Sequence, residues 1–262
     1  MSWNGFKKKI NRVGTMLKQT TGMIGKTEDK EFNSKERRFK SYEKKITTLC
    51  NEAKEYLNYV RALTLNEYKI AEEIDGLYNE NFDMALCAMN FKTAAGKIND
   101  GTRLEFDNNY ITTVLNPVNQ LGVNFPTVNQ LISKRENKLL DYDECKSKVD
   151  KLVDKPSNDP TNLTRAEDKL NYAKEAYDVI NDALLEYLPK PLNTRIDYLE
   201  PSFDALILSQ LSFSEKSFNT LNELQNKFAI AGANLENLED LTQRSDYALQ
   251  ELKKLGICNF HQ

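Results

Sequence analysis

Histidine is almost absent from this sequence of 262 residues, and the one that occurs, His261, lies next to the C-terminus. At that position it can orient no catalytic partner, which removes the usual general bases, the Ser-His and Cys-His pairs and nearly all zinc sites. No GxG arrangement and no GxxxxGK motif occurs, so the glycine loops that cradle phosphates are missing. We therefore expect no catalytic residue, no metal site and no cofactor, and a protein that is not an enzyme.

Long apolar runs are missing too. The longest, Met84 to Met89, has six residues and is far too short to span a bilayer. The four cysteines are widely scattered and form no paired metal motif, which is typical of a reducing compartment. We expect a cytoplasmic protein that meets a membrane, if at all, at its surface and without an anchor.

A basic surface that would fit nucleic acid is also lacking, because the net charge is −3 and no nucleic-acid-binding module pattern occurs. The carboxylates Asp141, Asp143 and Glu144 lie close together in the sequence. In a strongly charged helix they are expected to form a solvated face rather than an acid–base pair.

What the sequence does contain is a long heptad pattern, which organises the chain. Apolar residues recur at 3-4 spacing with one polar exception, Glu67: Phe39, Tyr42, Ile46, Leu49, Ala53, Tyr56, Val60, Leu63, Glu67, Ile70, Ile74 and Leu77. Such a repeat predicts a long helix, from about residue 28 to 81, that buries this seam in a left-handed supercoil. We expect Leu49 and Tyr56 to be buried in the seam.

Two further helical regions follow, each with proline inside it. The second runs from about Met84 to Val153 and contains Pro117 and Pro126, which should kink it. Residues 155–160 form a clear break, with Asn162 or Thr164 as plausible caps of the third helix. The third region continues to Phe228 and is disturbed at residues 188–191.

The predicted fold is therefore all-α: an elongated, kinked, antiparallel coiled coil of three helices over residues 28–232. A tail at 233–262 is expected to add one short helix packed on the bundle. The 12 Tyr and 12 Phe exceed what so thin a bundle can bury, and dimerisation would cover the remainder.

The first 27 residues differ from the rest because they carry six basic and no acidic residues. On a helical projection the apolar residues share an arc of about 80°, and these are Trp3, Phe6, Ile10, Val13 and Leu17. The basic residues Lys7, Lys8, Lys9, Arg12 and Lys18 spread over the remaining surface. This pattern predicts an amphipathic basic helix followed by a flexible joint around Gly22 and Gly25.

A helix this short is marginal alone in water and needs a partner for its apolar face. An anionic lipid surface is a natural partner, because each basic residue near it contributes on the order of 1 kcal/mol. The alternatives are that the helix docks on the protein's own bundle or in the groove of another protein.

Four stretches resemble the BAR domain of the amphiphysin family. They are the basic start Met1-Ser2-Trp3 with Gly5-Phe6-Lys7-Lys8, the stretch from Gly25 to Phe32, the block KRENKLLDYD at residues 134–143, and Leu188-Pro189 with Arg195 downstream. The third is the most specific, since it matches the family's K-R-x-x-K-L-x-D-Y-D pattern. The resemblance covers roughly residues 1–230, and no SH3 domain follows, as in short fungal members of the family.

This resemblance implies a crescent-shaped dimer whose concave face lies on curved membrane, with roles in endocytosis and cortical actin organisation at the plasma membrane. It also implies pairing either with a second copy or with a longer SH3-containing relative. By position, it places Lys134, Arg135 and Lys138 on a basic concave surface that binds lipid headgroups, although their spacing alone indicates only a charged, solvated face. Near the turn between the second and third helices, Lys151, Lys155 and Arg165 would add to this surface.

This turn is poorer in lysine than the resemblance leads one to expect, so electrostatic attraction to lipid should be weaker than in animal relatives. Two readings without lipid binding stay open: a spectrin-like mechanical rod, and a helical adaptor like the vesicle-fusion regulators. No internal repeat near a hundred residues supports the first.

Overall fold

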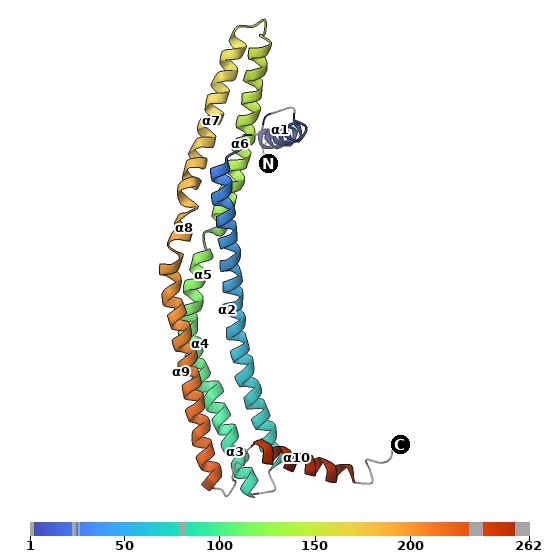
Figure 1. Ribbon diagram of the computed structural model, residues 1–262, viewed down its shortest axis with the longest axis vertical. Coiled ribbons are helices and arrows are strands. Elements are labelled where there is room, and N and C mark those ends of the chain that lie inside the picture. Colours follow the sequence, from blue (N-terminus) through green and yellow to red (C-terminus); the bar gives the residue numbers. More distant parts are fainter. Residues whose placement is uncertain (1–2, 23–24, 26, 79–81, 231–237, 255–262) are drawn as a thin grey trace. The chain divides into compact units, whose positions relative to one another are not determined.

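The computed structural model describes the backbone of residues 3–22, 25, 27–78, 82–230 and 238–254. Every regular element in these ranges is helical (Figure 1). The helices are α1 (Trp3–Thr20), α2 (Lys30–Leu77), α3 (Phe82–Lys97), α4 (Arg103–Tyr110), α5 (Asn116–Gly122), α6 (Phe125–Asp154), α7 (Thr161–Tyr187), α8 (Lys190–Asn193), α9 (Arg195–Ile230) and α10 (Leu238–Lys253).

The first of the three predicted long helices is continuous, whereas the other two are broken into segments. Two π-helical turns, Ile98–Thr102 and Ile111–Leu115, interrupt the second region. Pro117 and Pro126 lie in the first turns of α5 and α6, where a missing backbone N–H disrupts nothing. These prolines therefore mark the starts of new helices rather than kinks within one helix. The third region breaks at Leu188–Thr194 and carries Pro201 inside α9.

By their internal contacts the helices form two compact units. Unit 1 comprises Met1–Lys54 and Thr112–Ala205, and unit 2 comprises Glu55–Ile111 and Leu206–Gln262. The N-terminal segment belongs to unit 1 through the contact of α1 with α6. The sequential division into residues 1–27, 28–232 and 233–262 stays a prediction.

Unit 1 is built on the hairpin of α6 and α7, which run side by side in opposite directions (Figure 1). The first half of α2 packs on this hairpin. Their shared apolar core contains Phe32, Phe39, Tyr42, Ile46, Phe125, Val128, Ile132, Leu184, Leu188 and Leu192. Phe125 meets the rings of Phe39 and Tyr42 edge-on, at centroid distances of 5.7 and 5.8 Å.

The turn between α6 and α7 falls at residues 155–160, where the break was predicted. Neither Asn162 nor Thr164 is the cap, however. Pro160 occupies the N-cap position and makes no side-chain hydrogen bond. Asp159, one residue earlier, satisfies the first N–H of α7, because its Oδ1 accepts hydrogen bonds from the backbone N–H of Thr161 at 2.9 Å and from its hydroxyl at 2.8 Å. The backbone hydrogen bond, followed by the hydroxyl bond, lowers the pKa of Asp159.

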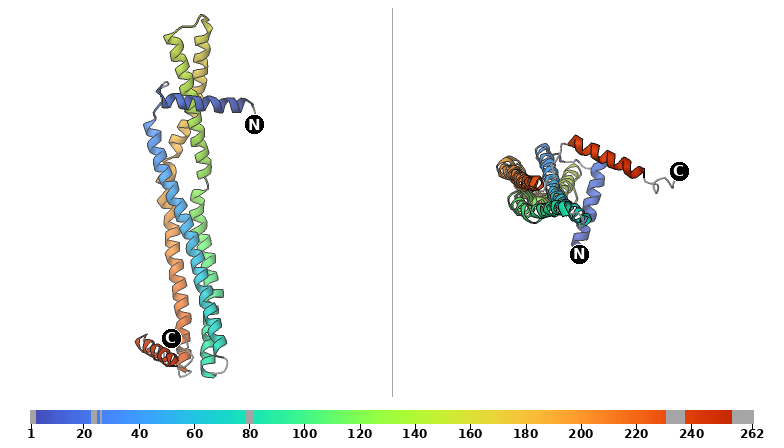
Figure 2. Two further views of the ribbon diagram at one scale, coloured as in Figure 1. Left: turned by 90° about the vertical axis from the view of Figure 1, so that its right-hand side faces the viewer. Right: turned by 90° about the horizontal axis from the view of Figure 1, so that it is seen from below.

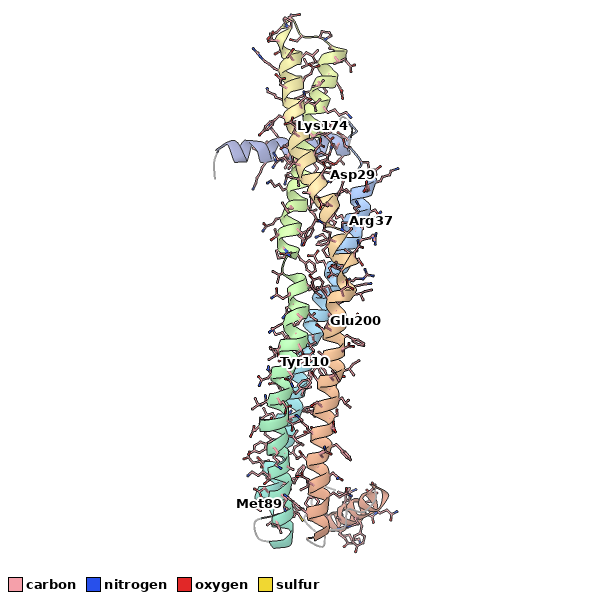
Figure 3. All side chains as sticks on the ribbon, turned by 90° about the vertical axis from the view of Figure 1, so that its left-hand side faces the viewer. Asp29, Arg37, Met89, Tyr110, Lys174 and Glu200 are labelled. Atoms are coloured by element: carbon pink, nitrogen blue, oxygen red, sulfur yellow. The ribbon has the colours of Figure 1, made fainter. Side chains whose placement is uncertain are left out.

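Unit 2 contains an aromatic cluster at α4. Phe106 stacks on Tyr110 (Figure 3) with ring centroids 5.3 Å apart. Phe106 also contacts the rings of Tyr56 on α2 and Phe213 on α9. Burial, followed by the nearby Tyr56, raises the pKa of Tyr110 to about 12. The cluster ties three helices of this unit together.

The heptad seam of α2 is buried only in part. Phe39, Tyr42, Ile46, Ala53 and Val60 are buried as predicted. The prediction for Leu49 is wrong, because this residue is 40% exposed, and Tyr56 is only partly buried. The buried set instead includes Leu57, Thr64 and Ala71, so the inward face of α2 turns away from the row that contains Leu49, Leu63 and Ile70.

The tail does contain a helix, α10. Its described side chains, from residue 242 to 254, are all exposed. The expectation that this helix packs on the bundle is therefore not met by these side chains.

Candidate functional site

Helix α1 lies across α6 and is in contact with it (Figure 2). The guanidinium of Arg12 forms a bidentate ion pair with Asp141, with Nε–Oδ1 and Nη2–Oδ2 distances of 2.9 and 2.8 Å. The hydrogen bond to Asp141 raises the pKa of Arg12 further. Gln19 donates from Nε2 to Asp143 Oδ2 at 2.8 Å, and Thr15 between them is buried. One face of α1 is thereby fixed to the protein.

The opposite face of α1 is apolar and directed away from the protein. Ile10, Val13 and Leu17 are between 56% and 63% exposed. All three were predicted from the sequence. Met16 is 62% exposed but lies on the side of α1 near α6, where it lines a hollow with Leu139 and Leu140. The side chains of the other predicted inserting residues, Trp3 and Phe6, lie outside the described residues, as do those of Lys7 and Lys8.

The sequence predicted two alternative contacts for this helix, one with the protein's own bundle and one with an outside apolar phase. These two contacts involve different faces of the helix. Residues seven apart lie on one side of a helix, as Arg12 and Gln19 do on the docked side and Ile10 and Leu17 on the outward side. Docking on α6 therefore leaves the apolar side chains uncovered.

The segment that connects α1 to α2 is anchored to the same part of α6. Asp143, which is 2% exposed, accepts hydrogen bonds from the hydroxyl of Thr27 at 2.6 Å and from its backbone N–H at 3.3 Å. Because Asp143 also accepts from Gln19, one carboxylate joins the end of α1, the connecting segment and α6.

Arg135 anchors the start of α2 in the same way. Its Nη2 donates to Asp29 and to the hydroxyl of Tyr177, each at 2.8 Å, and its Nε donates to Asn181 at 2.7 Å. The guanidinium also lies 3.4 Å from the ring centroid of Phe32. Asp29 directly precedes α2 (Figure 3). Arg135 thus links α2, α6 and α7.

The block at residues 134–143 is therefore mainly an internal anchor. The prediction that Arg135 binds a lipid headgroup is wrong for this structure, because the residue is 3% exposed and all of its donors named above serve protein partners. The predicted solvated carboxylate face is also wrong for Asp143, which is buried. Lys134 is exposed and Lys138 is partly exposed, so these two stay available to a ligand.

The predicted basic residues near the turn are accessible. Lys151, Lys155 and Arg165 are all exposed, and Arg165 lies 3.9 Å from Asp159. A hollow of about 530 Å³ between α6 and α7 is lined by Lys148, Lys151, Arg165 and Lys169 around Cys145, Leu152, Asn162 and Ala166. Lys148 and Lys169 were not predicted, although their spacing of three and four residues from Lys151 and Arg165 was a usable signal. Burial raises the pKa of Cys145, which lines this hollow.

Unit 2 exposes large apolar side chains on α2 and on α9, and these are together called its apolar surface below. Along α2, Tyr59, Leu63, Ile70 and Leu77 are between 55% and 81% exposed. Along α9, the exposed large apolar residues are Ile207, Leu208, Leu211, Phe218 and Leu221. Exposed apolar surface of this extent on a folded unit is typical of a protein–protein interface.

Within the described ranges, no helix is long and apolar enough to cross a membrane. No group of three potential metal-ligating side chains occurs among the described residues.

Comparison with known proteins identifies the class. Residues 6–229 match the BAR domain family, and the chain therefore belongs to that family. It is 36% identical over 261 residues to Protein hob3 of Schizosaccharomyces pombe, covering 100% of this chain and 99% of that protein. It is 38% identical over 229 residues to the Regulator of cytoskeleton and endocytosis RVS161 of Candida albicans, covering 86% of each.

A third relative is the Reduced viability upon starvation protein 161 of Saccharomyces cerevisiae, 35% identical over 282 residues and covering 98% of each chain. Among solved structures, the amphiphysin BAR domain from Drosophila matches with a TM-score of 0.65 and 21% identity, covering 80% of this chain and 97% of that one. The predicted resemblance to amphiphysin-type BAR domains, and the all-α fold that it implies, are confirmed.

Proposed function

We propose that this protein is a membrane-curvature scaffold that binds anionic bilayers, inserts the apolar face of α1 and acts in endocytosis and cortical actin organisation. The observation that carries the proposal is the orientation of α1. Its polar face is fixed to α6 while Ile10, Val13 and Leu17 are exposed. A helix held in this way can enter the headgroup region of a bilayer without leaving the protein.

The energetics favour membrane contact. Burying a large aliphatic side chain contributes about 1.5–3 kcal/mol relative to leaving it in water. The three outward side chains of α1, together with the exposed Lys9 and Lys18, would contribute more binding free energy than the single acyl chain that is enough for reversible membrane binding. Insertion of a wedge into one leaflet favours curved bilayers.

Headgroup contacts would come from basic side chains that are at least partly exposed. On α6 these are Lys134 and Lys138, and at the end of the α6–α7 hairpin they are Lys151, Lys155, Arg165 and the hollow that includes Lys148 and Lys169. Two of them have a carboxylate nearby: Lys148 pairs with Glu144 at 2.6 Å and Arg165 lies 3.9 Å from Asp159. Arg12 contributes less than predicted, because it is paired with Asp141. Arg135 is excluded from this set.

The cellular role rests on the relatives. The Candida albicans relative is named as a regulator of cytoskeleton and endocytosis, and we propose the same process for this chain. It would act as a cytoplasmic protein, peripheral on the plasma membrane at endocytic and cortical actin sites.

The apolar surface of unit 2 is the proposed dimer interface, with the partner either a second copy or a longer SH3-containing relative. Replacing the exposed Leu63 by glutamate should prevent pairing, because a carboxylate would be buried without a partner. Light scattering should then give the mass of one chain, 30.2 kDa, for this variant and twice that mass for the wild type.

The matched control is Asn58→Glu, which places the same charge at an exposed position on α2 about 140° around the helix from Leu63 and should leave the dimer intact. Co-purification with the longer relative distinguishes the two partners. The interface is refuted if the wild type stays monomeric in both settings, or if both variants behave alike.

Flotation on vesicles tests the proposal as a whole. The purified chain should bind vesicles that contain anionic lipid, prefer small over large diameters, and bind less at moderate than at low salt. Vesicles of neutral lipid serve as the control. A chain that floats with neither vesicle size, alone or with its longer relative, would be a rod or an adaptor without lipid contact.

A further inference from the structure

We propose that Asp141 and Asp143 form a seat that folds and orients α1 before the protein meets a membrane. The seat consists of the bidentate pair of Arg12 with Asp141 and the hydrogen bonds of Asp143 with Gln19 and Thr27. That the seat matters for insertion rests on the proposed function, whereas its effect on the folding of α1 does not.

Helix α1 needs such support because it is weak by itself. Gly5 and Gly14 lie inside it, no acidic residue stabilises its first turn, and its 18 residues are near the lower limit for an isolated helix in water. Its apolar side chains are largely exposed and contribute little packing. The polar contacts with α6, together with the buried Thr15, are then the main source of its order among the described side chains.

The hydrogen bonds that make up the seat are strong ones. Charged hydrogen bonds are about twice as strong as neutral ones, and the Arg12 pair is bidentate. Asp143 is 2% exposed and accepts three hydrogen bonds from two residues, so its carboxylate is well compensated. Because Thr27 shares this carboxylate, the seat also fixes where the connecting segment leaves α6.

Seating and insertion do not compete, because they use opposite faces of α1. The seat therefore presents a helix that is already formed, with Ile10, Val13 and Leu17 directed outward. A segment that is ordered beforehand does not lose that conformational freedom on binding, which strengthens binding. Loss of the seat should thus weaken membrane binding without abolishing it.

Amide hydrogen exchange of the full chain, without lipid, tests the seat. Asp141→Asn and Asp143→Asn should each speed the exchange of residues 9–20 by about tenfold or more. The matched control is Asp150→Asn, which removes the same charge at an exposed position on α6 and should change nothing in α1. Exchange of α7 shows whether the buried Asp143→Asn variant has disturbed the hairpin instead.

Two rescue variants make the test sharper. The double variant Arg12→Asp with Asp141→Arg reverses the ion pair and should restore exchange to within about threefold of the wild type. Gly14→Ala should slow exchange about fivefold in the Asp141→Asn background, because no atom lies within 4 Å of the added Cβ and alanine favours the helix.

The proposal is overturned if α1 of the wild type exchanges like an unfolded segment, or if neither carboxylate variant alters it. Flotation of the same variants on anionic vesicles separates this result from failure of the proposed function. Protected α1 with no vesicle binding in the wild type would refute the proposed function and leave the seat. Vesicle binding with unprotected α1 would refute the seat and leave the proposed function.

Discussion

Replacing Arg135 by alanine should lower the free energy of unfolding by about 3–5 kcal/mol, the range observed when one partner of a buried ion pair is removed. The loss arises because Asp29, Asn181 and Tyr177 would lose a shared donor, and Phe32 would lose the cation above its ring. Urea unfolding followed by circular dichroism measures it.

The neighbouring Lys134 provides the control. It is exposed, and Lys134→Ala should change stability by no more than about 0.5 kcal/mol. Arg135→Lys should fall between the two, because an ammonium cannot reproduce the fork that reaches Asp29 and Asn181 together. If Arg135→Ala were as stable as the wild type and lost vesicle binding, Arg135 would be a headgroup ligand after all.

Replacing Val13 by aspartate should weaken binding to anionic vesicles by about tenfold or more. The change removes one of the outward apolar side chains and would place a carboxylate in the headgroup–acyl boundary, where it is poorly solvated. Flotation at a fixed lipid concentration and salt measures it, with circular dichroism as a check that the helix content is retained.

Asn11→Asp is the matched control, since it adds the same charge to α1 at an exposed position outside the apolar face. It should weaken binding only slightly, through the electrostatic attraction to lipid. Equal losses in the two variants would mean that charge alone, and not insertion, governs binding.

The helical fold could be predicted because its signals are local. The heptad pattern gave α2, and Pro156 and Pro160 gave the turn between α6 and α7. The pattern could not separate Ala53 and Val60, which are buried, from Leu49 and Leu63, which are not. A seven-residue repeat shows which residues are apolar. It does not show which of them are covered by other helices of the same chain.

The position of Arg135 could not be predicted for a related reason. Its partners Asp29, Tyr177 and Asn181 are each more than 40 residues away in the sequence. Within the block 134–143, the exposed Lys134 and the buried Arg135 are adjacent cations that composition cannot distinguish. Only the packing of α2 and α7 on α6 decides which of them faces water.

On α1, by contrast, the periodicity alone identified Ile10, Val13 and Leu17 as one face, and these side chains are exposed together. What the sequence did not show is that Arg12 and Gln19 bind carboxylates on α6 rather than remaining free for lipid. A basic residue in an amphipathic helix suggests an anionic partner without identifying it.

Trp3 permits the most direct test of whether α1 enters a bilayer, because it is the only tryptophan in the chain. Its fluorescence emission should shift to shorter wavelength when anionic vesicles are added, and lipids with quenchers on their acyl chains should reduce it. Both effects should be larger for small than for large vesicles. Emission that stays at the wavelength of a water-exposed tryptophan while the protein floats with the vesicles would contradict insertion of α1.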